Sequence, residues 1–383
     1  MQLSIIILNY NVAQFLELCL CSVQRAIVNL DAEIIVVDNN SSDNSCERVK
    51  ANFPRVHLVE NDSNFGFPKG NNIGVAAAKG EYICILNPDT VVAEDTFEKI
   101  LTNILQRQAE NPASLGITGC KLIDGTGKFL PESKRGTPTP FVALTKIFGL
   151  YKIHLFFGKY YAQHLSENQS GEVDILVGAF MLMKRNLYLE IGGFDEDCFM
   201  YSDDIDLSYM VLRKELINYY YHETSVIHYK GESTIKDKTF MARFQQAMNF
   251  FYKKHFKVSR LFSIFMSVGI VFFSIFKKFQ GKSLAVSKPE HYYLLSDDSV
   301  LKENLKKQLK SDIAITEQAE GLFTITKSEI IFDNNYIDFK SIIAKMEHCK
   351  NKGHTYKIIP KNANFMVGSN SSDTRGEVIF FEF

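Results

Sequence analysis

The segment LSIIILNYN occupies residues 3–11 and decides the fold class. Its Ile-rich apolar run ends in Asn9, Tyr10 and Asn11, a pattern typical of a buried β-strand that delivers polar side chains to one edge of a sheet. Similar apolar runs follow at residues 33–37, 56–59, 81–86 and 116–122. Helical stretches separate these runs, which predicts βαβ units, a mostly parallel central sheet and an α/β fold.

The predicted helices fall between these strands and would cover both faces of the sheet. They span residues 14–28, 46–52, 69–79 and 94–108. The pattern further predicts strands at 173–183 and 217–228 and helices at 185–191, 205–215 and 239–256. Residues 124–171 interrupt this order with DGTGK and PESKRGTPTP, which indicates an insertion beside the ligand-binding edge.

Length, charge and cysteine usage limit the class of protein. The 383 residues exceed what one hydrophobic core usually serves, and 43 basic against 44 acidic side chains give no overall field that would attract nucleic acid. The seven cysteines lie scattered, as expected of reduced thiols in a cytoplasmic protein. The first residues match a strand and not a signal peptide, so we expect a cytoplasmic location.

We divide the chain into a catalytic domain (residues 1–255), an apolar helix with a linker (256–285) and a small α/β module of unassigned role (286–383). As a helix, the apolar stretch at 261–276 would be about 24 Å long, short of the ~30 Å hydrocarbon core of a membrane. Lysines flank this stretch on both sides and set no orientation. We therefore prefer a helix lying in the cytoplasmic leaflet, with a transmembrane span and a buried helix as the alternatives.

Polar residues also end the second predicted strand, in the segment VVDNNSSD (residues 36–43). The carboxyl ends of parallel strands form the ligand-binding edge of an open α/β sheet, so Asp38 is expected there beside Tyr10. Asp38 is suited to accept the imino N–H of a pyrimidine while Tyr10 stacks on the ring. The alternative is a turn that caps the following helix.

The segment NDSNFGFPKGNN (residues 61–72) precedes a predicted helix. Gly66 and Gly70 would let the backbone approach a ligand closely, and the N-terminus of a helix favours negative charge. The spacing matches neither the dinucleotide fingerprint GxGxxG nor the phosphate-binding loop GxxxxGK[ST]. This disfavours a nicotinamide-dependent or ATP-hydrolysing enzyme.

Two side chains are candidate ligands for a divalent metal. Asp89 follows a predicted strand in the segment LNPDT (residues 86–90) and would present a carboxylate to Mg²⁺ or Mn²⁺. His228 ends the predicted strand 217–228 and offers a neutral ring nitrogen. Both have structural alternatives, since Asn-Pro-Asp is a common turn and a single His at a strand end often serves packing alone.

The densest acidic cluster is GGFDEDCFMYSDDIDL (residues 192–207). Neighbouring carboxylates raise one another's pKa, so that one of them can serve as a general base near neutral pH. Asp203 and Asp204 are the candidates. The alternative is helix capping and a favourable interaction with the helix dipole.

Taken in order, these motifs resemble the inverting family 2 glycosyltransferases, which have the Rossmann-like GT-A fold, and most of all their rhamnosyltransferase-like branch. The resemblance covers roughly residues 1–235. It rests on the blocks SIIILNYN, VVDNNSSD, NFGFPKGNNIG, LNPDT, VGAFMLMKR, GGFDEDCFMYSDDIDL and HYKGEST.

The resemblance implies a role for each motif. Asp89 and His228 would hold Mg²⁺ or Mn²⁺, and Asp204 would take the proton of the acceptor hydroxyl, with Asp203 as the reserve candidate. Apart from the resemblance, we hypothesise that Lys134 and Arg135 in the insertion meet a lipid-linked diphosphate; the alternative is a solvent-exposed basic turn. The residues expected to bind the donor nucleotide, sugar and diphosphate are Asn9, Tyr10, Asn11, Asp38, Asn39, Asn64, Gly66, Gly70, Asn71, Asn87 and Gly178.

Two motifs depart from the family's usual pattern. The family's Asp-x-Asp is Asn87-Pro88-Asp89 in this chain, which removes one anionic metal ligand. The family's Glu-Asp pair is Asp203-Asp204, which shortens the first carboxylate. The metal site is therefore expected to be weaker than usual, and the role of base is shared between neighbouring residues.

The predicted function is transfer of a sugar from a nucleoside diphosphate donor, either dTDP-rhamnose-like or a UDP-sugar, in cell-surface polysaccharide synthesis. The acceptor would be a glycan or a polyprenyl-diphosphate-linked sugar at the cytoplasmic face of the membrane. One alternative is a non-catalytic polysaccharide-assembly protein, against which the intact Asp89, Asp204 and His228 argue. The other is a sugar nucleotidyltransferase, which would need a triphosphate-binding loop that the segment NYNVAQFLE (residues 9–17) lacks.

Overall fold

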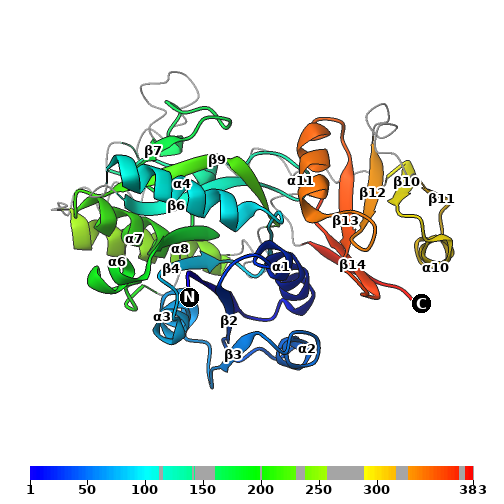
Figure 1. Ribbon diagram of the computed structural model, residues 1–383, viewed down its shortest axis with the longest axis horizontal. Coiled ribbons are helices and arrows are strands. Elements are labelled where there is room, and N and C mark those ends of the chain that lie inside the picture. The colour runs from blue at the N-terminus through cyan, green and yellow to red at the C-terminus, as the bar shows by residue number, and fades with distance from the viewer. Residues whose placement is uncertain are drawn as a thin grey trace.

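The computed structural model describes two α/β units that share a core (Figure 1). The described residues are 1–111, 115–139, 142, 160–198, 201–229, 238–256, 289–315, 327–370 and 376–382. The first unit comprises the described residues up to 256, and the second begins at residue 289.

The first unit is built on a sheet in the order β3-β2-β1-β4-β8-β6-β9-β5, with β7 paired to β9. β3, β2, β1 and β4 are parallel to one another, and β6 and β9 run the same way because β8 is antiparallel to both β4 and β6. The predicted α/β class with a mostly parallel central sheet is confirmed. The strands are β1 (Leu3–Asn9), β2 (Ala32–Asp38), β3 (His57–Glu60), β4 (Tyr82–Leu86), β5 (Thr90–Val91), β6 (Leu115–Ile123), β7 (Gly171–Val173), β8 (Phe180–Lys184) and β9 (Ile217–His228).

Helices cover both faces of this sheet, as the alternating pattern predicted. In β1, Ile5 and Ile7 point into the core formed with α1 and α4, whereas Ile6 points into the core on the opposite face, formed with α3 and α7. Both faces bury apolar side chains, so β1 is fully enclosed and fixes the centre of the unit. The helices are α1 (Ala13–Ala26), α2 (Ser45–Asn52), α3 (Gly66–Ala77), α4 (Thr96–Glu110), α6 (Arg185–Glu190), α7 (Asp203–Leu212) and α8 (Lys238–His255), with a short 3-10 turn at Pro131–Ser133.

One predicted strand is wrong. The segment 173–183 forms two strands, β7 and β8, which pair with different neighbours, β9 and β4. Between them, Ile175 makes an isolated bridge with Arg135, and Gly178 lies against Asp204 and Phe67. The continuous apolar run conceals this turn, because its residues are buried against the insertion instead of in one ladder.

The second unit has a smaller sheet in the order β11-β10-β12-β13-β14-β15. Its first four strands are parallel to one another, and β14 is antiparallel to both of its neighbours, β13 and β15. Asp298 caps α10 by accepting from Val300 and Leu301 N–H, and Asp338 caps α11 by accepting from Ser341 N–H. The elements are β10 (His291–Leu295), α10 (Ser299–Leu309), β11 (Ile313–Ile315), β12 (Ser328–Asp333), α11 (Phe339–His348), β13 (Thr355–Ile359), β14 (Phe365–Gly368) and β15 (Glu377–Phe380).

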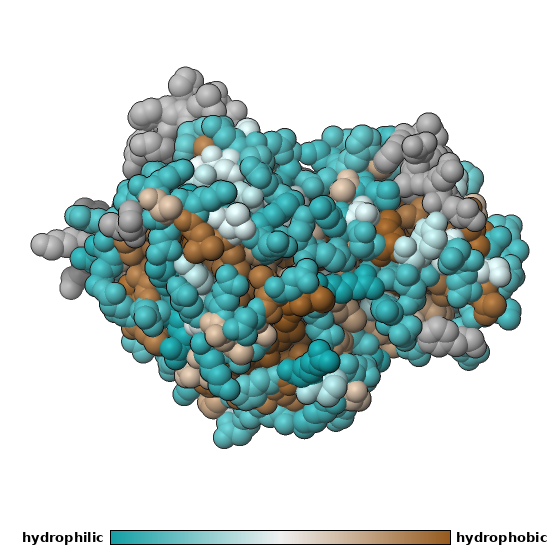
Figure 2. Space-filling view, in the orientation of Figure 1, coloured by the Kyte–Doolittle hydropathy of each residue, from teal (hydrophilic) through white to brown (hydrophobic). Residues whose placement is uncertain are grey.

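The two units pack through a shared hydrophobic cluster. Val91 of β5 and Ile227 of β9 lie in one cluster with Phe339, Ile342 and Met346 of α11. Polar contacts surround it: Glu94 accepts from the backbone N–H groups at the start of α11, and Lys121 pairs with Glu347 at 2.9 Å. Hydrophilic residues line the visible edge of this junction in Figure 2. The second unit therefore packs against the β5–β9 pair and supports it.

A mutation at this junction is expected to destabilise both units together. Phe339 is fully buried, and the Arg25 guanidinium lies 5.3 Å from the centre of its ring. Phe339→Ala should lower the free energy of unfolding by about 3–5 kcal/mol, the usual cost of truncating a buried aromatic residue. The measurement is urea unfolding followed by two probes, one in each unit. Coincident transitions are expected. Two separate transitions, with only the second unit weakened, would contradict a shared core, and the exposed Val300→Ala serves as the control.

The predicted domain boundaries lie near the ends of described segments, since α8 ends at His255 and β10 begins at His291. The predicted apolar helix at 261–276 lies outside the described residues. No helix within the described segments is both long and apolar enough to cross a membrane. Part of the insertion, residues 140–141 and 143–159, also lies outside the described residues, as do residues 230–234 of the HYKGEST block.

Candidate functional site

The polar strand ends of the first unit meet at one edge of the sheet. Asn9, Asp38 and His228 are the last residues of β1, β2 and β9, which run in the same direction. Asp89 directly precedes β5, which pairs with the end of β9. The sequence therefore predicted this edge correctly, because parallel strands bring their carboxyl ends together.

The ends of β1 and β2 are locked together by side chains. Asn9 Nδ2 donates to Asp38 Oδ1 at 2.7 Å and to Ser41 Oγ at 3.1 Å. Asp38 is buried and also accepts from the backbone and hydroxyl of Ser41. Asp38 thus shapes the loop, and its direct contact with a pyrimidine stays a prediction. Tyr10 is 39% exposed beside this loop and is free to stack on a flat ring.

Asn11 and Asn39 extend the cluster in two directions. Asn11 has a positive φ of 56° and accepts from Ser42 N–H at 2.7 Å. Asn39 donates to Gly66 O at 3.0 Å and to Asn64 Oδ1 at 3.3 Å, which ties β2 to the start of α3. Local geometry explains why Gly66 and Gly70 are glycines. Gly66 has a φ of 82°, and a Cβ on Gly70 would come within 2.4 Å of Leu8 Cδ1.

Asn71 is placed differently from the prediction. Its side chain is fully buried and donates to Phe67 O, one turn back in its own helix. The structure therefore does not bring the Asn71 side chain into the cluster of polar residues around Asn9, Asp38 and Asn39, the strand-end cluster. The next residue, Asn72, makes long-range contacts instead, donating to Phe194 O and to Glu196 Oε1, both at 2.9 Å.

Asp89 and His228 face each other at the other end of the site. His228 Nε2 lies 3.4 Å from Asp89 Oδ1 and 3.3 Å from Asn87 Nδ2. The positions are fixed by the β5–β9 ladder, where Thr90 pairs with His228, and by the hydrogen bond from Tyr229 N–H to Asp89 O at 3.0 Å. Both residues are more than nine-tenths buried.

The Asp89–His228 pair fits a divalent cation. Asp89 Oδ1 is buried without a hydrogen-bond partner, although it faces a ring nitrogen. An unsatisfied buried carboxylate oxygen is costly unless something positive binds it. A carboxylate oxygen and an imidazole nitrogen are both suited to a divalent metal. Within the described residues, no group of three or more Asp, Glu, His or Cys side chains that could hold a metal ion is found.

The acidic cluster reaches the same edge through the loop before β8. Asn87 N–H donates to Ala179 O at 3.1 Å, and the adjacent Gly178 N–H donates to Asp204 Oδ2 at 3.2 Å. A Cβ on Gly178 would lie 3.4 Å from Asp204 Cβ and 3.5 Å from the ring of Phe67 in α3. Two neighbouring residues, 178 and 179, thus connect Asp204 to the turn that carries Asp89.

The basic pair in the insertion is not a solvent-exposed turn. Lys134 is buried, and its Nζ donates to the carbonyl oxygens of Tyr161, Ala162 and Leu165. Arg135 Nη2 lies 2.6 Å from Asp204 Oδ2, and both side chains are nearly buried. The predicted contact of this pair with a lipid-linked diphosphate is wrong for the arrangement seen, because neither cation has its charge directed outward.

The two candidate bases have different surroundings. Burial and the neighbouring negative charge of Asp204 raise the pKa of Asp203 to about 7. Asp204 instead carries the ion pair with Arg135. Asp203 is thus suited to hold a proton near neutral pH, whereas the Asp204 carboxylate is held by Arg135.

This difference predicts a pH dependence of stability. Since the pKa of Asp203 rises from 3.8 to about 7 on folding, the folded state binds more protons than the unfolded chain between these values. Its contribution to the free energy of unfolding must then fall as pH rises through that window. Asp203→Asn removes the titration, so the variant should lose less stability than the parent between pH 4.5 and 8 in urea unfolding. Parallel curves for the two proteins would show that Asp203 is already ionised when folded.

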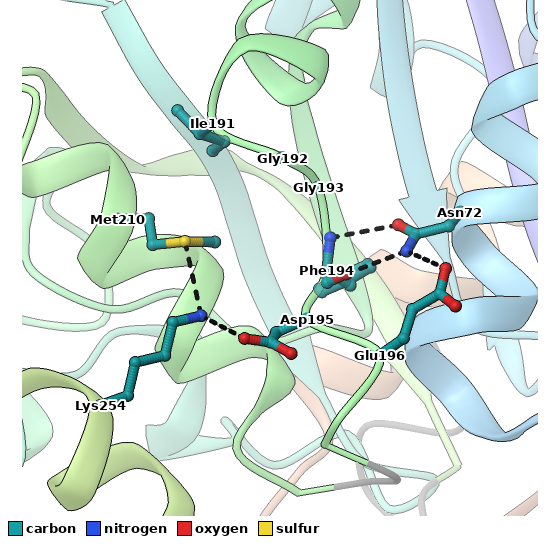
Figure 3. Close-up of a pocket in the computed structure, with 9 residues that line it drawn as sticks. All are labelled: Asn72, Ile191, Gly192, Gly193, Phe194, Asp195, Glu196, Met210 and Lys254. Atoms are coloured by element: carbon teal, nitrogen blue, oxygen red, sulfur yellow. Dashed lines mark hydrogen bonds and ion pairs between the residues drawn. The ribbon is translucent and has the colours of Figure 1, made fainter.

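A cavity of about 430 Å³ is lined by residues of α3, α7 and α8 and by the loop before α7 (Figure 3). In it, Lys254 of α8 pairs with Asp195 at 2.6 Å and with the buried Asp206 at 2.7 Å. His255 also contacts Asp206, at 2.5 Å. This network fixes the loop before α7 to α8. Its lining residues are Asn72, Ile191, Gly192, Gly193, Phe194, Asp195, Glu196, Met210 and Lys254.

Comparison with known proteins identifies relatives of this chain. The chain matches the model of glycosyl transferase family 2 over residues 4–206. It is 23% identical to the N-acetylglucosaminyl-diphospho-decaprenol L-rhamnosyltransferase of Mycobacterium tuberculosis over 246 residues, which cover 61% of this chain and 78% of that protein. It is 26% identical to the rhamnosyltransferase WbbL of Escherichia coli over 221 residues, 54% of this chain and 78% of that protein. The low-salt glycan biosynthesis hexosyltransferase Agl10 of Haloferax volcanii is 27% identical over 220 residues, 56% of this chain and 63% of that protein.

The family match spans more than half of the chain and includes the ends of β1 and β2, the Asn-Pro-Asp turn and most of the acidic cluster, whereas His228 lies beyond it. It ends at Asp206, three residues after the start of α7. The chain therefore belongs to glycosyl transferase family 2 and is a glycosyltransferase.

Proposed function

We propose that this enzyme transfers a sugar, with inversion, from a nucleoside diphosphate donor to a hydroxyl of a glycan or of a polyprenyl-diphosphate-linked sugar. The observation that carries the proposal is the connection from His228 and Asp89, through Asn87 and residues 178–179, to Asp204. A site for a metal and diphosphate and a site for a base would thus be neighbours, as in-line displacement requires.

The donor would lie along the strand-end cluster. Tyr10 would stack on the base, Asn9, Asn11 and Asp38 would shape the nucleoside site, and Asn39 and Asn64 would border the diphosphate path. The start of α3, with Gly66 and Gly70, would face the diphosphate, because a helix N-terminus favours negative charge. A pyrimidine donor, either dTDP-rhamnose-like or a UDP-sugar, fits these contacts.

Asp89 and His228 would hold Mg²⁺ or Mn²⁺, and that cation would offset the negative charge of the departing diphosphate. Asp204 would accept the proton of the acceptor hydroxyl while the acceptor oxygen bonds to the anomeric carbon. The bond between that carbon and the diphosphate oxygen breaks in the same step, and its electron pair leaves with the diphosphate. A single displacement of this kind inverts the anomeric centre.

The relatives support the acceptor class. The mycobacterial relative is named as acting on a diphospho-decaprenol-linked sugar, and two of the three relatives described above are rhamnosyltransferases. By this likeness we propose a rhamnosyl-type donor, a lipid-linked or glycan acceptor and a role in cell-envelope polysaccharide synthesis. A lipid-linked acceptor would place the enzyme at the cytoplasmic face of the membrane.

A nucleotide screen tests the proposal. The full chain is heated with dTDP, UDP or GDP, each with Mn²⁺, Mg²⁺ or EDTA, and its unfolding midpoint is recorded. A nucleotide at 100 times its Kd should stabilise the fold by about 2.7 kcal/mol. We expect a pyrimidine nucleotide to stabilise it more with metal than with EDTA, and release of nucleoside diphosphate when the sugar donor and acceptor are mixed. No shift with any of these nucleotides would contradict a donor site, and binding without turnover would favour a non-catalytic protein.

A further inference from the structure

Arg135 is anchored beside the loop that carries Gly178. Its backbone N–H donates to Ile175 O, and its carbonyl accepts from Ile175 N–H, both at 2.9 Å. Its Nη2 donates to Leu176 O at 3.1 Å. The guanidinium is therefore held by the backbone of the segment that leads to Gly178, and its position does not depend on a flexible surface loop.

The same guanidinium nitrogen binds Asp204. Arg135 Nη2 lies 2.6 Å from Asp204 Oδ2, and Gly178 N–H donates to that same oxygen at 3.2 Å. Side-chain exposure is only 10% for Arg135 and 13% for Asp204, so water screens the pair weakly. Both contacts fall on Oδ2, which leaves Oδ1 as the oxygen that can meet a ligand.

Charged neighbours define what Asp204 experiences. Within the described residues, Asp203 precedes it in α7, and Tyr160 shares Arg135 by a hydrogen bond. Lys254 and His255 of α8 are occupied by Asp206, two positions further along α7. Arg135 is therefore the cation that faces Asp204 in this part of the chain, and it offsets the negative charge that two adjacent carboxylates would otherwise share.

We propose that Arg135 is a positioning residue for the general base: its ion pair with Asp204 Oδ2 offsets the charge of that carboxylate and directs Oδ1 to the acceptor hydroxyl. The inference rests on the proposed function, in which Asp204 takes the acceptor's proton. The proton moves from the acceptor oxygen to Oδ1 while the carbon–oxygen bonds exchange as described above. The neighbouring Asp203, whose pKa is raised, is the carboxyl group that holds a proton near neutral pH.

The test compares Arg135→Met and Arg135→Lys with the parent. The rate of nucleoside diphosphate release from dTDP-rhamnose, or from the UDP-sugar that the screen selects, is measured with a polyprenyl-diphosphate-linked sugar from pH 5 to 9. A carboxylate that loses a neighbouring cation gains a higher pKa by about one unit or more. Since the base must be deprotonated, the acid limb of the kcat profile should move to higher pH by that amount in Arg135→Met, with kcat lower by about 10- to 100-fold.

Arg135→Lys keeps the charge and should recover part of both effects. Binding of dTDP and UDP with Mn²⁺ should change less than about twofold in either variant, because Arg135 contacts Asp204 and not the strand-end cluster. Lys134→Met is the matched control, since it removes a buried cation from the same turn, one whose Nζ donates to three backbone carbonyl oxygens. It should lower stability without moving the acid limb.

An Arg135→Met profile with the parent's midpoint would overturn the inference, and so would an equal shift in Lys134→Met. The proposed function fails differently. Full activity in Asp204→Asn would contradict Asp204 as the base whatever Arg135 does. An inactive Asp204→Asn together with an unshifted Arg135→Met would overturn the positioning role alone.

Discussion

Asp204→Asn is expected to lower kcat by about 10²- to 10⁴-fold, the usual contribution of a positioned general base. The amide keeps the size of the carboxylate but cannot accept the acceptor's proton. The measurement is the initial rate of nucleoside diphosphate release at saturating donor and acceptor. Binding of the nucleoside diphosphate with Mn²⁺ should be retained, because Asp204 contacts Arg135 and Gly178 and lies outside the strand-end cluster.

Folding must be checked in the same variant, since it leaves the buried Arg135 without its counter-charge. A matched control is Asp312→Asn, at a side chain that is 91% exposed in the second unit. It should have the parent's rate. If Asp204→Asn were folded and as active as Asp312→Asn, the base would have to be another group.

Asp89→Asn is expected to remove most metal-dependent turnover, by about 100- to 1000-fold, since stabilising the leaving diphosphate by a cation is worth several kcal/mol and each 1.36 kcal/mol is a factor of ten. The neutral amide removes the one carboxylate of the proposed pair. Rates are measured over a range of Mn²⁺ concentrations. We expect the concentration for half-maximal rate to rise strongly and donor binding to lose its metal dependence.

His228→Ala provides the companion measurement for the same pair. It should weaken the metal response in the same direction, because His228 Nε2 faces the same Asp89 oxygen. A parent-like metal response in Asp89→Asn would place the cation elsewhere. Asp312→Asn again serves as the matched control.

Much of the site could be predicted from the sequence because it lies at strand ends. The bounds of β9 matched the prediction, and β2 is longer than predicted by one residue at each end. Parallel strands of known direction carry their terminal residues to one edge, so Asn9, Asp38 and His228 had to lie at the same edge of the sheet. This placement needs only strand pattern and direction, both of which are local.

Other features depend on contacts that no local pattern reveals. Arg135 and Asp204 are 69 positions apart, and an Arg in a Pro- and Gly-rich segment resembles any surface cation until the fold buries it. Asn71 and Asn72 are adjacent and chemically identical, and only the direction of each along α3 separates their roles. The strand predicted at 173–183 failed for the same reason, because burial against the insertion replaced a continuous ladder.

The second unit was predicted only as a small α/β module of unassigned role. Its attachment could not be predicted, because Phe339, Ile342 and Met346 have the spacing of an ordinary amphipathic helix. The structure shows that this face packs on the strands carrying the Asp89–His228 pair. We therefore expect the module to support the metal site mechanically, in addition to any role of its own.

The most direct test of the account is a crystal structure of the chain with Mn²⁺ and the nucleoside diphosphate that stabilises it most, using the anomalous signal of manganese. The account predicts one manganese peak bound by Asp89 and His228 and by diphosphate oxygens, with the base of the nucleotide beside Tyr10. It also predicts that Asp204 opens onto the same cleft. A manganese peak and diphosphate bound at another surface, with Asp89 and Asp204 both remote from the nucleotide, would contradict it.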